Sequence, residues 1–209
     1  MKITQATVYI VDDDDSFRKS LRRLISAMGF NVIDFDSALT FLEISRLQRP
    51  ACLVLDFNLP KMDGLGLQEE LIVREITLPI IFITGQGSIP VSVKAMKKGA
   101  IDFLQKPFSS HEISLLISQA IALDDQNRRK EKITKEIKSF LNFLTPREQE
   151  VLRWVVTGRP SKQIASKLGT TEKTIRVHRG RIMKKMHANS VADLVRSTQL
   201  LNITPPVSK

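Results

Sequence analysis

Apolar and polar positions in the first half of the chain form blocks that predict a strand followed by a helix, five times over. Short runs rich in Val, Ile and Phe predict strands at residues 8–11, 32–35, 52–55, 80–83 and 103–104. The segments between them have the spacing of amphipathic helices, at residues 17–28, 38–44, 65–75, 91–98 and 112–123. Five such units predict an α/β fold, a doubly wound parallel sheet covered by helices on both faces.

The second half has a different pattern, and no strand is predicted after Leu104. Residues 124–138 are rich in charge and lack Gly and Pro, which predicts a solvated, helical linker. Four short helices follow, at residues 146–156, 161–168, 172–186 and 191–200. Thr145 and Thr171 precede two of them as N-caps. We therefore expect an α/β domain at 1–124, a charged helical linker at 125–139 and a small all-α domain at 140–204.

Composition narrows the class of protein. The 209 residues are 42% apolar and 26% charged, as in ordinary soluble globular proteins. The single cysteine, Cys52, excludes an internal disulfide and a cysteine zinc cluster, and it fits a reducing compartment. Because no apolar run is long enough for a signal peptide or a membrane span, we expect a cytoplasmic protein with no membrane partner.

Charge separates the two halves. Residues 1–124 hold 13 Lys and Arg against 15 Asp and Glu, a net charge of −2. Residues 125–209 hold 19 against 7, a net charge of +12. This asymmetry indicates two domains with different partners, and the second half suits a polyanion, either nucleic acid or an anionic membrane surface.

Polar residues stand at the carboxyl ends of the predicted strands, where open parallel sheets collect their chemistry. Asp12 and Asp13 follow the first strand, Asp56 the third, Thr84 the fourth and Lys106 the fifth. Three carboxylates at one edge call for a cation, and hard oxygen ligands with room for water suit Mg²⁺. A carboxylate nucleophile, a metal, a lysine and a hydroxyl are the parts that phosphoryl transfer to aspartate requires.

The acidic run at residues 12–15 has a simpler interpretation, since acids are favoured at helix N-termini. We expect that role for Asp14 and Asp15. Asp56 is different, because an ionisable group directly after a buried strand is costly without a function. Polar residues at four strand ends together favour a phosphoryl site.

Residues 161–168 and 172–186 predict a helix-turn-helix, with a tight turn at Gly169. The second helix carries a dense set of cations: Lys173, Arg176, Arg179, Arg181, Lys184 and Lys185. A membrane-surface helix would need a broader apolar face with exposed aromatic residues. The pattern therefore favours the major groove of duplex DNA.

Several motifs of the first half resemble the receiver domain of two-component response regulators. They are Val11-Asp12-Asp13, Leu55-Asp56 with Asn58-Leu-Pro60 and Met62-Asp-Gly64, Ile83-Thr84-Gly85, Gly99-Ala100, Asp102-Phe103 and Lys106-Pro107-Phe108. Spacing and order match over roughly residues 5–123. The resemblance implies a flavodoxin-like, five-stranded receiver with strand order 2-1-3-4-5.

The same resemblance assigns roles to residues. Asp56 is the expected phosphoacceptor. The expected Mg²⁺ ligands are Asp13, Asp56 and the backbone carbonyl of Asn58, with Asp12 acting through water. Thr84 and Lys106 are expected to hold the phosphoryl oxygens, and Phe103 to act as a switch aromatic. The Lys106–Pro107 peptide bond is expected to be cis.

The second half is similar to the LuxR-type DNA-binding domain over roughly residues 141–200, which makes the whole chain resemble the NarL/FixJ-type response regulators, closest to the FixJ-like group. The similarity rests on Phe143-Leu-Thr145-Pro-Arg-Glu148, Gly158, Lys162-x-Ile164-Ala165, Thr174-Ile-Arg-Val-His178 and Lys185. It implies base reading by Lys173, Thr174, Arg176 and Val177, and phosphate contacts by Lys162, Arg179, Lys184 and Lys185. Gly180 lies inside the predicted recognition helix, where glycine lowers helix stability by roughly 1 kcal/mol relative to alanine. It also removes a side chain that could contact a base, so the sequence preference at that position is left open.

The expected function is transcription regulation by a response regulator, not an enzyme beyond its own phosphorylation and dephosphorylation. A sensor histidine kinase would phosphorylate Asp56, and this would control homodimerisation and sequence-specific binding to promoter DNA. Contact with RNA polymerase is left open. Two other classes remain: a constitutive dimerisation scaffold joined to a DNA-binding module, and a phosphotransferase acting on another substrate.

Overall fold

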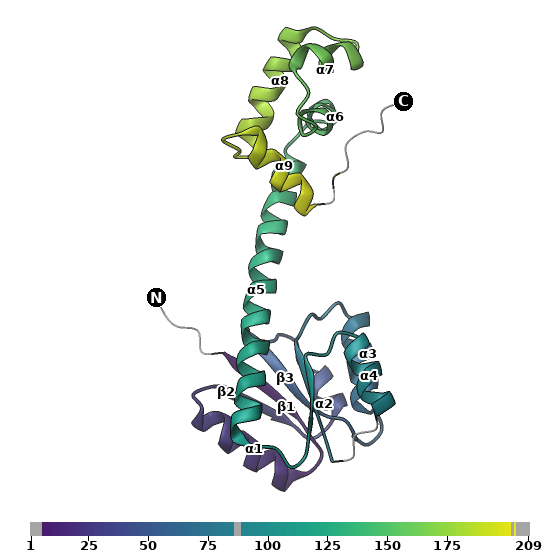
Figure 1. The fold of residues 1–209 in the computed structure, drawn as a ribbon, viewed down its shortest axis with the longest axis vertical. Coiled ribbons are helices and arrows are strands. Elements are labelled where there is room, and N and C mark those ends of the chain that lie inside the picture. The colour runs from purple at the N-terminus through teal and green to yellow at the C-terminus, as the bar shows by residue number, and fades with distance from the viewer. Residues whose placement is uncertain (1–5, 86–88, 202, 204–209) are drawn as a thin grey trace. The chain divides into compact units, whose positions relative to one another are not determined.

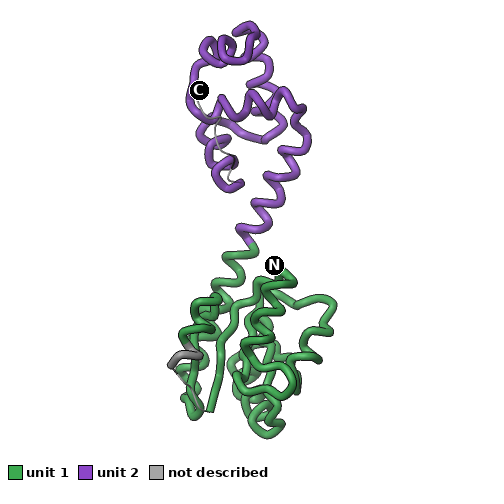
Figure 2. The backbone as a smooth tube through the Cα atoms, turned by 90° about the vertical axis from the view of Figure 1, so that its right-hand side faces the viewer, with its two compact units in different colours: residues 1–128 green, residues 129–209 purple. Residues whose placement is uncertain are grey.

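The computed structural model describes residues 6–85, 89–201 and 203. Those residues form five strands and nine helices, divided into two compact units at residues 1–128 and 129–209 (Figure 2). The expected end of the second domain at residue 204 lies outside the described residues. No helix within the described part of the chain is long and apolar enough to cross a membrane.

Five parallel strands form the sheet of the first unit (Figure 1). They are β1 (Thr7–Val11), β2 (Asn31–Phe35), β3 (Ala51–Asp56), β4 (Ile80–Thr84) and β5 (Asp102–Gln105). The order is β2-β1-β3-β4-β5, so the predicted doubly wound α/β fold is confirmed. Val11 pairs with Leu55, and Thr84 pairs with Gln105. The strands therefore end in register, which brings residues far apart in sequence to one edge.

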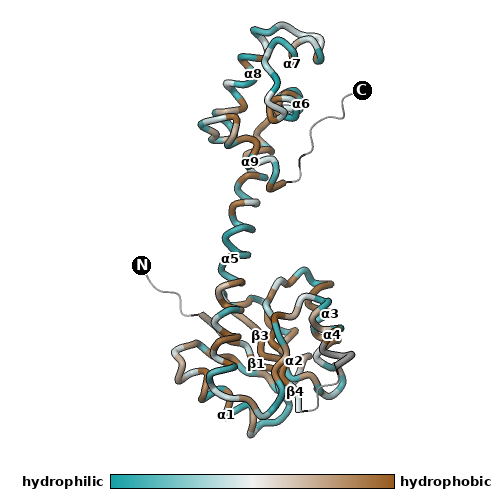
Figure 3. The backbone as a smooth tube through the Cα atoms, viewed as in Figure 1, coloured by the Kyte–Doolittle hydropathy of each residue, from teal (hydrophilic) through white to brown (hydrophobic). Residues whose placement is uncertain are grey.

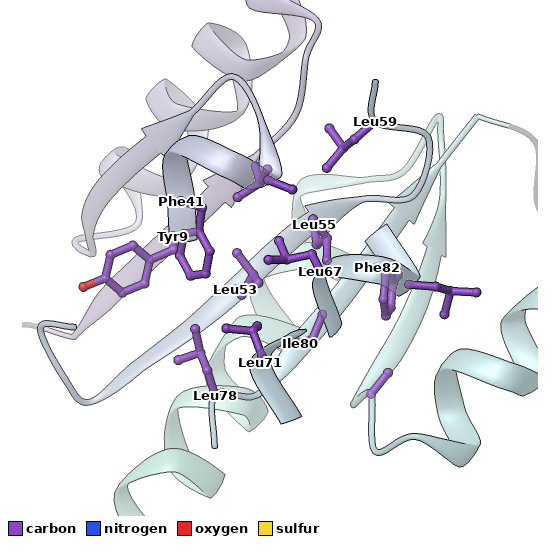
Figure 4. Packing of buried hydrophobic residues seen from close by; sticks show 14 of the residues in the cluster. Tyr9, Phe41, Leu53, Leu55, Leu59, Leu67, Leu71, Leu78, Ile80 and Phe82 are labelled. Atoms are coloured by element: carbon purple, nitrogen blue, oxygen red, sulfur yellow. The ribbon is translucent and has the colours of Figure 1, made fainter. Parts of the chain in front are cut away.

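Alternate side chains of each buried strand face opposite sides of the sheet. On one side, Tyr9, Leu53 and Phe82 pack with residues of three helices, α2 (Ala38–Leu42), α3 (Gly64–Val73) and α4 (Ile89–Lys97) (Figure 4). On the other side, Ile10 and Val54 pack with α1 (Asp15–Ala27) and with residues 113–120 of α5 (Ser110–Asn142). Two apolar layers thus hold the sheet rigidly, as a site on its edge requires.

The charged segment expected as a linker lies within α5, and Figure 3 shows the hydrophilic character of that helix past the receiver-like unit. The interpretation of residues 124–138 as solvated is wrong at Asp124 and at Ile137, which is buried in the core of the second unit. Asp124 is fully buried, because its carboxylate is bonded by the guanidinium of Arg49 and the backbone N–H of Ala51.

The second unit holds α6 (Pro146–Val155), α7 (Ser161–Lys167), α8 (Glu172–Lys185) and α9 (Val191–Leu200). Its core is built from apolar residues of these helices, among them Leu152, Ile164 and Ile182. The predicted caps are confirmed: Thr145 forms a capping box at α6, and the hydroxyl of Thr171 accepts from the backbone at α8. Local sequence therefore fixes where α6 and α8 begin, whereas α7 follows Pro160 with no side-chain cap.

Candidate functional site

Two carboxylates meet one ammonium at the carboxyl edge of the sheet. The Nζ atom of Lys106 lies 2.8 Å from Oδ2 of Asp12 and 2.8 Å from Oδ1 of Asp56. Asp12 follows β1, Asp56 ends β3, and Lys106 follows β5, so the sheet register assembles the three. The Lys106–Pro107 peptide bond is cis, as the sequence resemblance implies.

Burial makes this cluster electrostatically sensitive. Asp12 is 1% exposed and Asp56 is 5% exposed. Burial raises the pKa of Asp12, with the nearby Asp56 adding to the rise, against the opposing effect of Lys106. Burial would lower the pKa of Lys106, but the hydrogen bonds and charges of both carboxylates outweigh it and raise that pKa. The lysine is thereby held as a cation beside Asp56.

Two other predicted metal ligands, Asp13 and Asn58, are more exposed to solvent than Asp12 and Asp56. Asp13 and Asn58 are exposed, and the backbone N–H of Asn58 donates to Oδ2 of Asp56 at 2.8 Å. Among the described residues, no three His, Cys, Asp or Glu side chains are grouped as a metal centre. The donor set still fits Mg²⁺, which typically takes one or two carboxylates and keeps several waters. Asp12, Asp13 and Asp56 carry three negative charges against one on Lys106, so a divalent cation would balance the cluster.

Thr84 and Phe103 are the remaining predicted residues of this site. Thr84 is fully buried at the end of β4, and its carbonyl accepts from the N–H of Lys106 at 2.7 Å. Phe103 is half-buried on β5 and stacks on Phe82 with ring centroids 6.1 Å apart. The ring centroid of Phe57, the residue after Asp56, lies 6.3 Å from that of Phe103. An aromatic cluster therefore connects Phe103 with the residue next to Asp56.

Three further residues shape the site, although the sequence analysis assigned no role to any of them. Arg18 donates to the backbone carbonyl of Asp12 at 2.8 Å and so fixes the loop after β1. A Cβ on Gly64 would lie 2.8 Å from the carbonyl oxygen of Asp56, so only glycine allows that approach. The ring of Phe17 lies beneath Lys106. Arg18 and Phe17 fall one turn into a helix, where the pattern gave no signal of function.

The capping interpretation of the other acids is confirmed. The side chain of Asp14 accepts from the N–H groups of Ser16 and Phe17 at 2.9 and 3.0 Å, and Asp15 lies in the first turn of α1. The acidic run therefore divides into residues that start a helix and residues that face the site.

In the second unit, the predicted DNA contacts lie on α8, apart from Lys162 on α7. Lys162, Lys173, Arg176, Val177 and Lys184 are exposed, whereas Ile175 and Ile182 of the same helix are fully buried. This helix thus has one face in the core and a cationic face in solvent, as a groove-reading helix requires.

Some of these side chains have internal partners. Lys185 lies 2.6 Å from the buried carboxylate of Glu148, and the hydroxyl of Thr174 is bonded to that of Thr171. Arg176 pairs with Glu172 on the solvent face at 2.6 Å, while Arg179 donates to a backbone carbonyl at 3.3 Å. A DNA contact by Lys185 or Thr174 would have to compete with these bonds, so their roles stay predictions.

The edge site on a receiver-like sheet, followed by a helix-turn-helix, defines a class of protein. Residues 8–118 match the family model described as response regulator receiver domain, and residues 142–198 match bacterial regulatory proteins of the luxR family. The chain belongs to the response regulators that join these two domains, and its relatives are transcriptional regulators.

Within that class the chain resembles the FixJ-like group. It is 44% identical to nodulation protein W of Bradyrhizobium diazoefficiens over 96% of this chain and 88% of that protein. It is 36% identical to the transcriptional regulatory protein FixJ of the same organism, over 92% and 94%. The solved structure of the response regulator StyR covers 93% of this chain and 98% of its own at 43% identity, with a TM-score of 0.80. The solved structure of full-length FixJ covers 96% of this chain and 98% of its own at 34% identity, with a TM-score of 0.58.

Proposed function

We propose that Asp56 is the phosphoacceptor and that its phosphorylation by a sensor histidine kinase controls dimerisation and sequence-specific DNA binding. The observation that carries the proposal is the pair of 2.8 Å contacts from Lys106 to Asp12 and Asp56 at the carboxyl edge of the sheet. This is the arrangement that positions a carboxylate nucleophile beside a fixed cation.

In the proposed reaction, a carboxylate oxygen of Asp56 attacks the phosphorus of a phosphohistidine or a small acyl phosphate. A bond from that oxygen to phosphorus forms, the bond from phosphorus to the donor breaks, and the donor leaves with its electron pair. Lys106 keeps its proton and turns from the carboxylates to a phosphoryl oxygen. The hydroxyl of Thr84 donates a hydrogen bond to another phosphoryl oxygen, and Phe103 repacks as Thr84 moves.

Receiver domains generally bind Mg²⁺ at this acidic pocket. Here Asp13, Asp56 and the carbonyl of Asn58 would hold the ion, with Asp12 bonded to one of its waters. When bound, Mg²⁺ would supply charge neutralisation for the phosphoryl oxygens. Asp12 would keep the residues of the β1 edge aligned through its bond to the N–H of Asp14, at 2.9 Å.

For DNA, we assign base reading to Arg176 and Val177, with Lys173 and Thr174 at the start of the same helix. Lys162, Arg179, Lys184 and Lys185 are assigned to phosphates. The exposed cationic face of α8 supports a contact of this helix with DNA. A response regulator that carries a DNA-binding domain works with a sensor kinase and DNA as partners; RNA polymerase is a further candidate at the promoter.

Incubation with acetyl phosphate and Mg²⁺, followed by intact mass analysis, tests the phosphoacceptor. The wild type should gain one phosphoryl group, and so should Asp102→Asn, which removes an exposed carboxylate at the opposite end of β5. Asp56→Asn should gain none. Equal labelling of Asp56→Asn would overturn the assignment, and no labelling of the wild type would favour a constitutive scaffold. Turnover of a phosphorylated substrate would favour the phosphotransferase class.

A further inference from the structure

An aromatic ring lies against the lysine of the site. The Nζ atom of Lys106 is 3.9 Å from the centroid of the Phe17 ring. Phe17 belongs to the first turn of α1 and is half-buried. Phe108 contacts that ring edge-on, with ring centroids 6.1 Å apart and ring planes at 88°.

The surroundings of the ammonium are divided between anions and the ring. Lysine has three N–H donors, and two of them are satisfied by Asp12 and Asp56 at 2.8 Å. A cation this close to a ring centroid is attracted by the negative face of the aromatic system. The ring therefore occupies a position from which water would otherwise solvate the third donor.

The lysine stem explains why such a contact matters. It has four flexible carbons, so an ammonium with no neighbour on its far side samples many orientations. The side chain of Lys106 is 23% exposed, and solvent is therefore within its reach. An aliphatic residue at position 17 would fill the same space but would not attract the charge.

We propose that Phe17 is a positioning residue for phosphoryl transfer, whose ring face holds the Lys106 ammonium beside Asp56 while the phosphoryl group arrives. The inference rests on the proposed function of Asp56. It assigns to Phe17 an electrostatic role that acts through Lys106, in addition to its packing against Phe108.

The experiment is a substitution series in the full-length protein with acetyl phosphate and Mg²⁺. Phe17→Leu should lower the phosphorylation rate by about two- to tenfold, since the attraction of the ring is lost. Phe17→Tyr keeps an aromatic face and should restore most of the rate. Phe108→Leu is the matched control, because it removes the other ring of the same pair and leaves the cation–π contact between Lys106 and Phe17 in place.

NMR of the Lys106 ε-methylene protons tests whether the ring face of Phe17 lies against Lys106 in solution, and the phosphorylation rates across a fluorinated series at position 17 separate attraction from packing. Ring-current shielding should place these protons upfield in the wild type and in Phe17→Tyr, and loss of the signal in Lys106→Arg would identify it. Phe17→Leu should remove the upfield shift, whereas Phe108→Leu should largely keep it. If Phe17→Leu fails to fold, replacing Phe17 by fluorinated phenylalanines of increasing fluorine content tests the same attraction at nearly constant shape.

The inference would be overturned if Phe17→Leu were phosphorylated at the wild-type rate and its Lys106 signals stayed at their wild-type positions. The role of Asp56 would remain intact. Equal rate losses in Phe17→Leu and Phe108→Leu, with no trend across the fluorinated series, would also overturn the inference by assigning the effect to packing. A wild type that takes up no phosphoryl group at all would instead overturn the proposed function.

Discussion

The carboxylate of Asp124 on α5 is buried against the guanidinium of Arg49, the residue two places before β3. The Nε atom of Arg49 donates to Oδ2 of Asp124 at 3.1 Å, and Nη2 donates to Oδ1. The N–H of Ala51 also donates to Oδ2, at 2.8 Å. Arg49 reaches the carbonyl of Thr77 as well, at 2.5 Å. This cluster joins α5 to the amino ends of β3 and β4.

Removing Arg49 should therefore destabilise the first unit strongly, since it leaves a buried carboxylate without its cation. We expect Arg49→Met to lower the free energy of unfolding by about 3 kcal/mol. Hydrogen exchange at the amides of β1 and β3, measured in the full chain, reports this unit alone. The free energy of unfolding should fall less in the double variant Arg49→Met, Asp124→Leu than in Arg49→Met, because the double variant buries neither charge. A double variant as unstable as the single one would contradict this account of the cluster.

Magnesium should stabilise the first unit, and Asp12 should contribute to that effect. At a free Mg²⁺ concentration ten times the dissociation constant, the free energy of unfolding should rise by about 1.4 kcal/mol. Asp12→Asn should reduce that increase, because one of the groups that bind the ion through water is lost. Because the pKa of Asp12 is raised in the fold, its ionised form opposes folding, so Asp12→Asn should be no less stable than the wild type without Mg²⁺. Exchange at β1 measures both effects, and Asp102→Asn should respond to Mg²⁺ like the wild type.

Acid should weaken the second unit through Glu148. Burial raises the pKa of this carboxyl, but the bonds from Lys185 and Thr145 outweigh it and lower the pKa below the usual 4.5. The stabilising contribution is therefore present above that value and is lost as pH falls through the lowered pKa. Trp154, the single tryptophan, lies in α6 and reports the unfolding of this unit by fluorescence.

At neutral pH, Glu148→Gln should cost about 1–3 kcal/mol. Its stability should then fall less steeply than that of the wild type below about pH 5. Glu150→Gln, on the exposed face of the same helix, should follow the wild-type profile. Parallel pH profiles for Glu148→Gln and the wild type would rule out the ion pair as the source of the acid sensitivity.

Gly180 should be replaceable with a gain in stability. It lies inside α8, and a Cβ there would meet no atom within 4 Å. We expect Gly180→Ala to raise the free energy of unfolding by about 0.5–1 kcal/mol, measured by Trp154 fluorescence. Gly64→Ala is the contrasting case, since its Cβ would lie 2.9 Å from the ring of Phe82. We expect it to lower the free energy of unfolding of the first unit by about 1–3 kcal/mol. A loss of stability in Gly180→Ala would contradict the open surroundings of that residue.

The strands could be predicted well because the buried parallel strands β1, β3 and β4 consist almost entirely of apolar residues. It also placed Asp12, Asp56 and Lys106 together, since the carboxyl ends of parallel strands share an edge. These predictions needed only periodicity and topology.

Other features depend on which side chains meet across the fold. Asp124 begins a charged run, and nothing local distinguishes it from the solvated acids that follow. Lys185 is one cation among many on α8, and its partner Glu148 is 37 residues away. Phe17 reads as an apolar helix residue, and its contact with Lys106 arises only when α1 and the loop after β5 come together. Long-range pairing, not local pattern, decides these three.

The central claim is that phosphorylation of Asp56 controls binding to DNA by the second unit. Selection of DNA with phosphorylated protein at a stated salt concentration would first supply a specific site, since such affinities depend steeply on ionic strength. The most direct measurement is then the affinity for that site with and without phosphorylation, for the wild type and Asp56→Asn. The wild type should bind about 5- to 150-fold more tightly once phosphorylated, and Asp56→Asn should not respond. Equal affinities of the phosphorylated and unphosphorylated wild type would contradict the claim.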